Sequence, residues 1–344
     1  MIRNRKSAAE LQPSRMTIST ELVHRRPHPI RIWAALGAMA LAMQMYVYAR
    51  WVASEAFVAT PPGSDQVPQV AQVSGIAYEI VSIGILPFVL TWFVRGIRNT
   101  GRIDAIRLLM VGWLSAYWLD PFLNFLRPMF TYNAYNFNRG CWCEFIPGWQ
   151  AANGSRIAEP LLIDPPAYFY TFTATAMLAL WCMRKLKATF PNVGITGMTL
   201  AGFAGVWATM GLLDIVAARI MGFDAWPIAF QSASFWAGKY YQFPIYEFVL
   251  FPSIFVASAF LLHFADDKGQ TVIERGVESI GGPSWLRTAA RILAFIAFCN
   301  VLNLSYTAAM GVHALYADPW PSGMPSWLAD GQCGGMTGIA CARP

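Results

Sequence analysis

The stretch IRLLMVGWLSAYWLDPFLNF, residues 106–125, decides the fold, because it is apolar enough to cross a membrane and yet carries Asp120 directly before Pro121. About 20 mainly apolar residues are needed to cross a hydrocarbon layer of roughly 30 Å. A residue that precedes proline is disfavoured in the α-helical conformation, so the helix is expected to break near Asp120. Such a break must be satisfied by neighbouring protein groups, and the segment therefore belongs in a packed bundle.

The rest of the chain has the same apolar character. Of its 344 residues 56% are hydrophobic and only 13% are charged, which is too apolar for a water-facing surface of that size. Six further stretches are long enough to span, at residues 32–52, 76–94, 165–183, 195–219, 243–264 and 286–313. We predict an all-α, multi-pass membrane bundle of seven transmembrane helices. It comprises a basic arm (1–31), a membrane domain (32–313) and a C-terminal tail (314–344).

Basic residues set the predicted orientation. The N-terminal arm and the second, fourth and sixth loops hold 18 of the 25 Lys and Arg residues. Because basic residues favour the cytoplasmic side of short loops, the N-terminus is expected inside and the C-terminus outside. The net charge of +6 is therefore mostly topological, and the arm is expected to contact anionic lipid rather than nucleic acid.

Acidic residues share one depth on this topology. Asp120 and Asp214 fall in the outer parts of outward-running helices, and Glu247 falls near the outer start of an inward-running one. An ionisable group inside a membrane usually faces the bundle interior and has a partner or a role. We predict one carboxylate-lined cavity near the outer surface, with Glu79 and His313 at its rim. The alternatives are an Asp214–Arg219 ion pair and a purely helix-stabilising role for Glu247.

The outer loop at residues 127–164 is long and rich in aromatic residues and proline, as functional lids often are. It also brings Glu144, Glu159 and Asp164 to the side of the predicted cavity. The alternative is an amphipathic element at the lipid head groups.

Four cysteines fall on the predicted outer side, where disulfides persist. Cys333 and Cys341 enclose a glycine-rich turn, so we predict a bridge between them. Cys141 and Cys143 have the spacing of neither a zinc knuckle nor a redox motif. Cys182 and Cys299 lie within helices and are expected to be small core residues.

Several short strings, taken together, resemble the AveC-like spirocyclase family of bacterial integral membrane proteins. The likeness runs from the first helix to the Cys333/Cys341 tail, in the same order and with similar spacing. The strings that carry it are Trp118-Leu119-Asp120-Pro121 with Asn124, Tyr132-Asn133, Phe145-Ile146-Pro147-Gly148-Trp149, Glu159-Pro160-Leu161-Leu162, Tyr241-Gln242-Phe243-Pro244-Ile245-Tyr246-Glu247, Asp266-Asp267-Lys268-Gly269 and Glu274-Arg275-Gly276. Cys141 and Cys143 depart from the family's pattern. The resemblance implies a protein of the bacterial plasma membrane that closes a polyketide dihydroxy-ketone into a spiroketal, in some members with dehydration. It implies no cofactor and no metal.

That chemistry needs an acid, a base and an anion near an oxocarbenium ion, as at glycosidic centres. From depth and residue type we predict Asp120 as the acid and Glu247 as its ionised partner, with Asp214 as the alternative and Glu144 entering from the loop. The residues expected to bind the hydrophobic substrate are Trp118, Asn124, Tyr132, Trp149, Glu159, Tyr241, Gln242 and Tyr246.

Two other functions also fit a seven-helix bundle with buried charges. One is a proton-coupled transporter or a receptor for a hydrophobic ligand, although the acidic residues lie on one side and form no path across. The other is a scaffold for a membrane complex, which predicts a surface stripe and not an inward cluster. The charged inner loop with Asp266, Asp267, Glu274 and Glu278 is expected to be a solvated face, with a stabilising role as the alternative.

Overall fold

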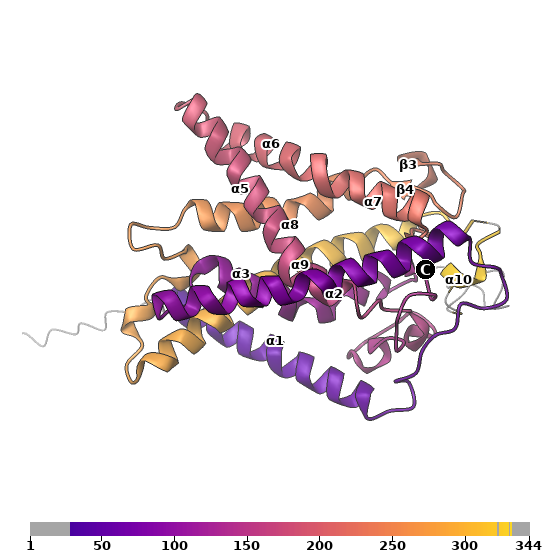
Figure 1. Ribbon diagram of the computed structural model, residues 1–344, viewed down its shortest axis with the longest axis horizontal. Coiled ribbons are helices and arrows are strands. Elements are labelled where there is room, and N and C mark those ends of the chain that lie inside the picture. The colour runs from indigo at the N-terminus through magenta and orange to yellow at the C-terminus, as the bar shows by residue number, and fades with distance from the viewer. Residues whose placement is uncertain (1–27, 322, 330, 332–344) are drawn as a thin grey trace, which may run out of the picture.

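The computed structural model is mostly helical, with long helices that run side by side along the long axis of the molecule (Figure 1). It describes residues 28–321, 323–329 and 331, so the predicted Cys333–Cys341 bridge lies outside the described residues. The helices are α1 (Pro29–Val52), α2 (Gln69–Thr100), α3 (Ala105–Ala116), α4 (Asp164–Pro166), α5 (Phe172–Thr189), α6 (Ile195–Val206), α7 (Leu212–Val216), α8 (Glu247–His263), α9 (Ser284–Tyr316) and α10 (Ser326–Ala329).

Six of the seven stretches predicted to span are helical almost throughout, whereas the sixth (243–264) starts as a short strand, Phe243–Pro244, and a turn before α8 begins at Glu247. Two of them are interrupted by π-helical turns, which join α4 to α5 (Ala167–Thr171) and flank α7 (Trp207–Gly211 and Ala217–Met221). Among the described residues, four helices are long and apolar enough to cross a membrane, namely Pro29–Val52, Gln69–Thr100, Ile195–Met221 and Ser284–Tyr316. The prediction of a helical, membrane-type chain is therefore confirmed. Seven crossings and the orientation of the termini stay predictions.

The predicted break at Asp120 is present. α3 ends at Ala116, and the chain continues as a 3₁₀-helix, Tyr117–Asn124, that contains Pro121. Proline has no N–H to donate and its ring crowds the preceding turn, so the α-helix cannot continue through it. The amide of Asn303 on α9 donates to the carbonyl of Ala116 at 3.1 Å, which satisfies part of the interrupted backbone.

α9 is the central element of the bundle and packs against α1, α3 and the 3₁₀-helix. Two glycines permit the close crossings: a Cβ on Gly37 of α1 would collide with the carbonyl of Leu293, and one on Gly112 of α3 would collide with that of Phe295. Small residues at such crossings let helix backbones approach closely, as is common in membrane bundles. This packing places the 3₁₀-helix with Asp120 in the interior.

The outer loop folds inward. Its strand β1 (Thr131–Tyr132) pairs antiparallel with β2 (Asp224–Ala225), and β3 (Ser234–Phe235) pairs with β4 (Phe243–Pro244) in the connection that leads to α8. Trp142 is completely buried, and its indole N–H donates to the carbonyl of Trp118 at 2.8 Å. The loop is therefore part of the protein core. An amphipathic element lying at the head groups would expose these aromatic residues on one side.

The expectation of a solvated inner loop is wrong for Glu274. This residue is fully buried, accepts from the backbone and hydroxyl of Thr271 at 2.9 and 2.7 Å, and pairs with Arg291 Nε of α9 at 2.6 Å. Glu278 and Lys268 do lie at the surface. A capping box starting at Thr271 explains the difference, because the Glu274 side chain turns back onto the start of its own 3₁₀-helix.

Candidate active site

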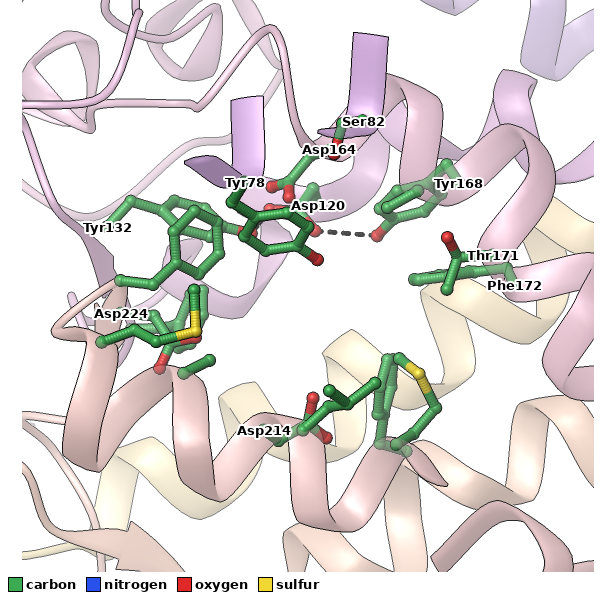
Figure 2. Close-up of a pocket in the computed structure, with 18 of the residues that line it drawn as sticks. Tyr78, Ser82, Asp120, Tyr132, Asp164, Tyr168, Thr171, Phe172, Asp214 and Asp224 are labelled. Atoms are coloured by element: carbon green, nitrogen blue, oxygen red, sulfur yellow. Dashed lines mark hydrogen bonds between the residues drawn. The ribbon is translucent and has the colours of Figure 1, made fainter. Parts of the chain in front are cut away.

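A cavity of about 540 Å³ lies among α2, the 3₁₀-helix, the outer loop, the α4–α5 helix, the Trp207–Met221 segment, α8 and α9 (Figure 2). Most of its wall is aromatic or aliphatic, including Phe130, Phe172, Phe223 and Phe251. Its polar groups are carboxyls and hydroxyls: Ser74, Tyr78, Ser82, Asp120, Tyr132, Asp164, Tyr168, Tyr170, Thr171, Asp214, Asp224, Glu247 and Tyr306. The size and the mixture of surfaces fit a single small organic ligand.

Three buried carboxyls form a cluster at one wall. One oxygen each from Asp120, Glu159 and Asp164 lies within 4.8 Å of the other two. Tyr132 donates its hydroxyl to Asp120 Oδ2 at 2.7 Å, and Tyr168 donates to Oδ1 at 2.8 Å. Figure 2 shows Asp120 and Asp164 together, with Tyr132 and Tyr168 on either side. Segments far apart in the chain thus meet at Asp120.

The two cavity-lining carboxyls of this cluster differ in their surroundings. Both oxygens of Asp120 accept phenol hydrogen bonds, which stabilise a negative charge. Asp164, just before the segment expected to span, is buried, and its Oδ2 has no hydrogen-bond partner among the described residues. Burial raises the pKa of Asp164 well above its usual range, and the neighbouring Asp120 charge raises it further. Asp164 is therefore the better place for a proton that the two carboxyls share, because Asp120 already accepts two phenol hydrogen bonds.

Three carboxylate oxygens at this spacing could also hold a hard cation such as Mg²⁺. One phenol proton already occupies an acceptor site on each oxygen of Asp120, and the second lone pair of each oxygen stays open. The same carboxyl oxygens can therefore share a proton among themselves.

A second group of carboxyls faces the first across the cavity. Asp214 and Asp224 lie there in Figure 2, and Glu247 at the start of α8 also lines the space. Tyr306 of α9 donates to Glu247 Oε1 at 2.6 Å, while Glu247 Oε2 is buried without a hydrogen-bond partner in the described part of the chain. Burial raises the pKa of Asp224 well above its usual range, and the charge of Asp214 adds to the effect. The cavity thus has carboxyls on two walls.

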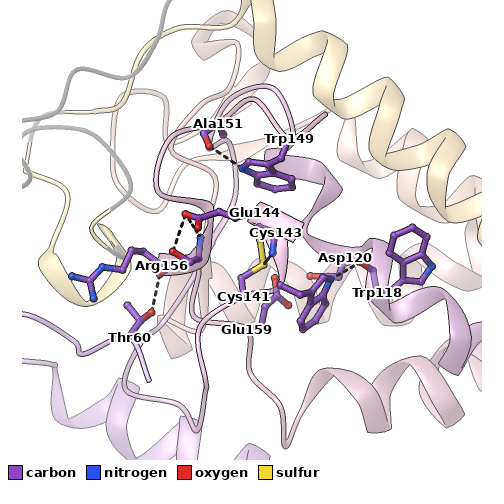
Figure 3. The surroundings of a disulfide bond; sticks show 12 residues. Thr60, Trp118, Asp120, Cys141, Cys143, Glu144, Trp149, Ala151, Arg156 and Glu159 are labelled. Carbon is purple, nitrogen blue, oxygen red and sulfur yellow. Dashed lines mark hydrogen bonds between the residues drawn. A yellow bond between two sulfur atoms is a disulfide. The ribbon is translucent and has the colours of Figure 1, made fainter. Parts of the chain in front are cut away.

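Four of the predicted site residues line this cavity: Asp120, Asp214, Glu247 and Tyr132. Glu159 belongs to the carboxyl cluster behind the wall and accepts from the Tyr117 hydroxyl at 3.4 Å. Glu144 does not reach the cavity. It is exposed and accepts from the hydroxyl of Ser155 at 2.9 Å, turned away from Asp120 (Figure 3).

The remaining predicted binding residues lie outside the lining, and each has a contact that supports the fold. Trp118 donates to Asn300 at 2.7 Å, Asn124 accepts from the Phe130 amide at 2.9 Å, and Gln242 donates to the Trp226 carbonyl at 2.9 Å. Trp149 donates to the Ala151 carbonyl at 2.8 Å (Figure 3). Tyr241 lies 4.0 Å from the Arg219 guanidinium, and the ring of Tyr246 stacks on that of His313 at 4.9 Å.

Several lining residues were not predicted as site residues, namely Tyr78, Asp164, Tyr168, Asp224 and Tyr306. The predicted topology brought Asp164 to the side of the predicted cavity but gave it no site role. Its position before Pro165-Pro166, at the start of a helix, is a local signal that could have identified it as a site residue. Asp224 follows an apolar span and had no local signal. Its position depends on the pairing of β2 with β1.

Cys141 and Cys143 form a disulfide within the outer loop (Figure 3). Both residues are completely buried, and Trp142 between them packs against Tyr48, Trp51 and Tyr117. The bridge fixes a tight turn that points Trp142 into the core, next to the 3₁₀-helix that carries Asp120.

We predict that protein isolated without reductant has no free thiol at Cys141 or Cys143, because disulfides persist on the outer side of a membrane. The measurement is alkylation of the denatured protein before and after reduction, followed by peptide mass spectrometry. Cys299, a free buried cysteine, is the internal control and is expected to react without reduction. Alkylation of Cys141 and Cys143 in the unreduced sample would contradict the bridge.

A family model described as Spirocyclase AveC-like matches residues 100–327, about two thirds of the chain. All the carboxyls of the cavity fall within the matched residues. Comparisons with curated proteins and with solved structures gave no match.

Proposed function

Because the chain belongs to the AveC-like spirocyclase family, we propose that its cavity closes a dihydroxy-ketone into a spiroketal. One hydroxyl adds to the ketone to give a hemiketal. Protonation of the hemiketal hydroxyl expels water and leaves an oxocarbenium ion. The second hydroxyl attacks this cation and loses its proton to a base, so the net reaction is dihydroxy-ketone to spiroketal plus one water.

The observation that carries the proposal is the buried carboxyl cluster in an otherwise apolar cavity. Protonation of a hemiketal and stabilisation of the resulting cation require an acid and an anion within reach of one carbon atom. Asp120 and Asp164 line the same wall and belong to a cluster whose oxygens lie within 4.8 Å. An apolar wall also excludes water, which would otherwise trap the cation and return the hemiketal.

We assign the proton donor to Asp164 and the charge to Asp120, the reverse of the role that sequence depth suggested for Asp120. The two phenols that donate to Asp120 stabilise its charge, and burial keeps the proton on Asp164. Glu247 on the opposite wall, with one oxygen unpartnered among the described residues, is the group that accepts the proton of the second hydroxyl. The aromatic faces of Tyr168 and Phe172 stabilise the cation.

The test is a reaction of the purified protein in lipid nanodiscs with a synthetic long-chain dihydroxy-ketone. The expected product has lost one water and has a single configuration at the spiro carbon, as measured by mass spectrometry and NMR. Spontaneous closure in mildly acidic buffer gives the reference rate and isomer mixture. A rate and an isomer ratio equal to that reference would reject the proposal.

Asp164→Asn is expected to lower the rate of closure about a hundredfold, within the usual range for a general acid. Because the reaction uses protonated Asp164, wild-type activity is present below the raised pKa of this carboxyl and is lost as the pH rises through it. The measurement is kcat against pH for both proteins. The variant should lack this alkaline limb, and a variant profile with the same limb as wild type would assign the proton donor elsewhere.

A further inference from the structure

The cavity has an apolar opening on the side of the molecule. Three large apolar residues line the cavity while remaining exposed: Val81 and Ile85 of α2, at 54% and 41% of their surface, and Leu213 of α7, at 57%. A residue that lines the cavity and is also exposed at the protein surface lies at an edge where the cavity opens to that surface. Together with Ala77 of α2 and Ala217 of the facing segment, they outline what we call the side window.

The two edges of the side window are continuous helix faces. Ala77, Val81 and Ile85 are spaced four residues apart, so they lie on one face of α2 over about 12 Å. On the other edge, Met210, Leu213 and Ala217 are spaced three and four residues apart in the segment broken by π-helical turns. Such π-turns often occur at functional sites. Neither edge carries a charge at the rim positions.

The side window lies at hydrocarbon depth. α2 belongs to the helices that are long and apolar enough to cross a membrane; Val81 and Ile85 fall well inside it, and Ala77 lies at the outer end of the span predicted at residues 76–94. Arg95, the first basic residue towards the inner end, lies ten residues or about 15 Å beyond Ile85. The opening therefore faces acyl chains and not water.

α2 is attached to the bundle mainly near its two ends. Towards its outer end, Glu79 accepts from the amide of Phe137 at 2.6 Å and Ser74 donates to the carbonyl of Met221 at 3.2 Å. Near its inner end, Arg107 donates to the carbonyls of Trp92 and Phe93 at 3.1 and 2.9 Å. Between these anchors Tyr170 donates to the carbonyl of Ser82 at 3.2 Å, and the described residues leave much of the lipid-facing side of α2 uncovered, with Ile80 66% exposed.

We propose that the ligand of this cavity enters sideways from the bilayer through the side window. It is then an amphiphile that partitions into the membrane: its hydroxylated ketone end reaches Asp120 and Asp164, and its apolar chain remains along the edges at Val81 and Leu213. This substrate class rests on the proposed function, because the carboxyl wall is what selects a hydroxylated ketone. The route itself rests on the exposed apolar rim.

The experiment uses a long-chain hydroxy-ketone with a diazirine beside its carbonyl, dissolved in phosphatidylcholine vesicles that contain the full-length protein. Irradiation should label the cavity wall, at Tyr168 or Phe172, as read by peptide mass spectrometry. Ala77→Trp with Leu213→Trp fills the side window, and the label is expected to fall about tenfold because the entry path is blocked. Ile80→Trp with Leu212→Trp is the matched control, since both residues are lipid-exposed on the same helices but do not line the cavity.

Equal labelling of the window and control variants would overturn the side entry. Leu213→Ala widens the opening and is expected to raise the label, so the proposal remains testable if the double tryptophan variant does not fold. Window-dependent labelling without any spiroketal product would overturn the proposed function alone. Spiroketal formation at an undiminished rate in the folded window variant would overturn the side entry alone.

Discussion

Asp120→Asn is expected to reduce spiroketal formation about a thousandfold while the protein still folds. Asparagine keeps the shape of the side chain but removes the charge that faces the cation and stabilises the proton on Asp164. The loss lies within the range of 10² to 10⁴ that general acid and base groups contribute. One of the two hydrogen bonds from Tyr132 and Tyr168 would remain, because the amide oxygen of asparagine can still accept a phenol proton.

The measurement is the single-turnover rate of closure in nanodiscs, with binding of the diazirine probe as the readout for an intact cavity. The matched control is Asp104→Asn, because Asp104 caps the start of α3, the helix that leads into the 3₁₀-helix with Asp120, and lies outside the cavity lining. We expect near wild-type turnover in the control. A rate for Asp120→Asn within a few-fold of wild type, with probe binding intact, would remove Asp120 from the chemistry.

The sequence was sufficient to predict the helical segments and the break in the third one. Both signals are local: an apolar run of sufficient length, and an acidic residue before a proline inside such a run. Helix direction then gave the depth of Asp214 and Glu247, and the structure brings both to the cavity that Asp120 lines. Every span crosses the bilayer along roughly the same axis, so the position of a residue within its span gives its depth in the membrane. Residues from different helices that share a depth can therefore be recognised from the sequence.

The rotation of each helix was harder to predict than its depth. Tyr241, Gln242 and Tyr246 precede or adjoin Glu247, yet only Glu247 lines the cavity, because the β3–β4 pairing turns its neighbours towards Arg219, Trp226 and His313. Asp164 and Tyr168 both lie beside Asp120, and they come from a helix that starts after the long outer loop. Such pairings depend on tertiary packing and leave no periodic pattern in the sequence.

The burial of Glu274 in the inner loop also depends on a tertiary contact that the sequence does not reveal. A loop with four acidic residues is expected to be solvated, and three of its charges, on Asp266, Asp267 and Glu278, are partly or fully exposed. Glu274 differs because Arg291 of α9 reaches it, and Arg291 also donates to the carbonyl of Ile103 at 2.9 Å, just before α3. One buried ion pair therefore connects the inner loop to α9 and to the start of α3.

Glu274→Ala is expected to lower the free energy of unfolding by about 3 to 5 kcal/mol, because it leaves the Arg291 charge partly buried without its partner. The measurement is a denaturant titration in mixed micelles followed by tryptophan fluorescence. Glu278→Ala is the matched control: its carboxylate is 56% exposed and lies 3.9 Å from Lys268, and such surface pairs contribute at most about 1 kcal/mol. The decisive comparison adds Arg291→Leu to Glu274→Ala, since removing the stranded charge should recover part of the lost stability. The contrary outcome is that Arg291→Leu lowers the free energy of unfolding by the same amount in the Glu274→Ala variant as in the wild type. The two side chains would then not be coupled, and other contacts would hold the inner loop.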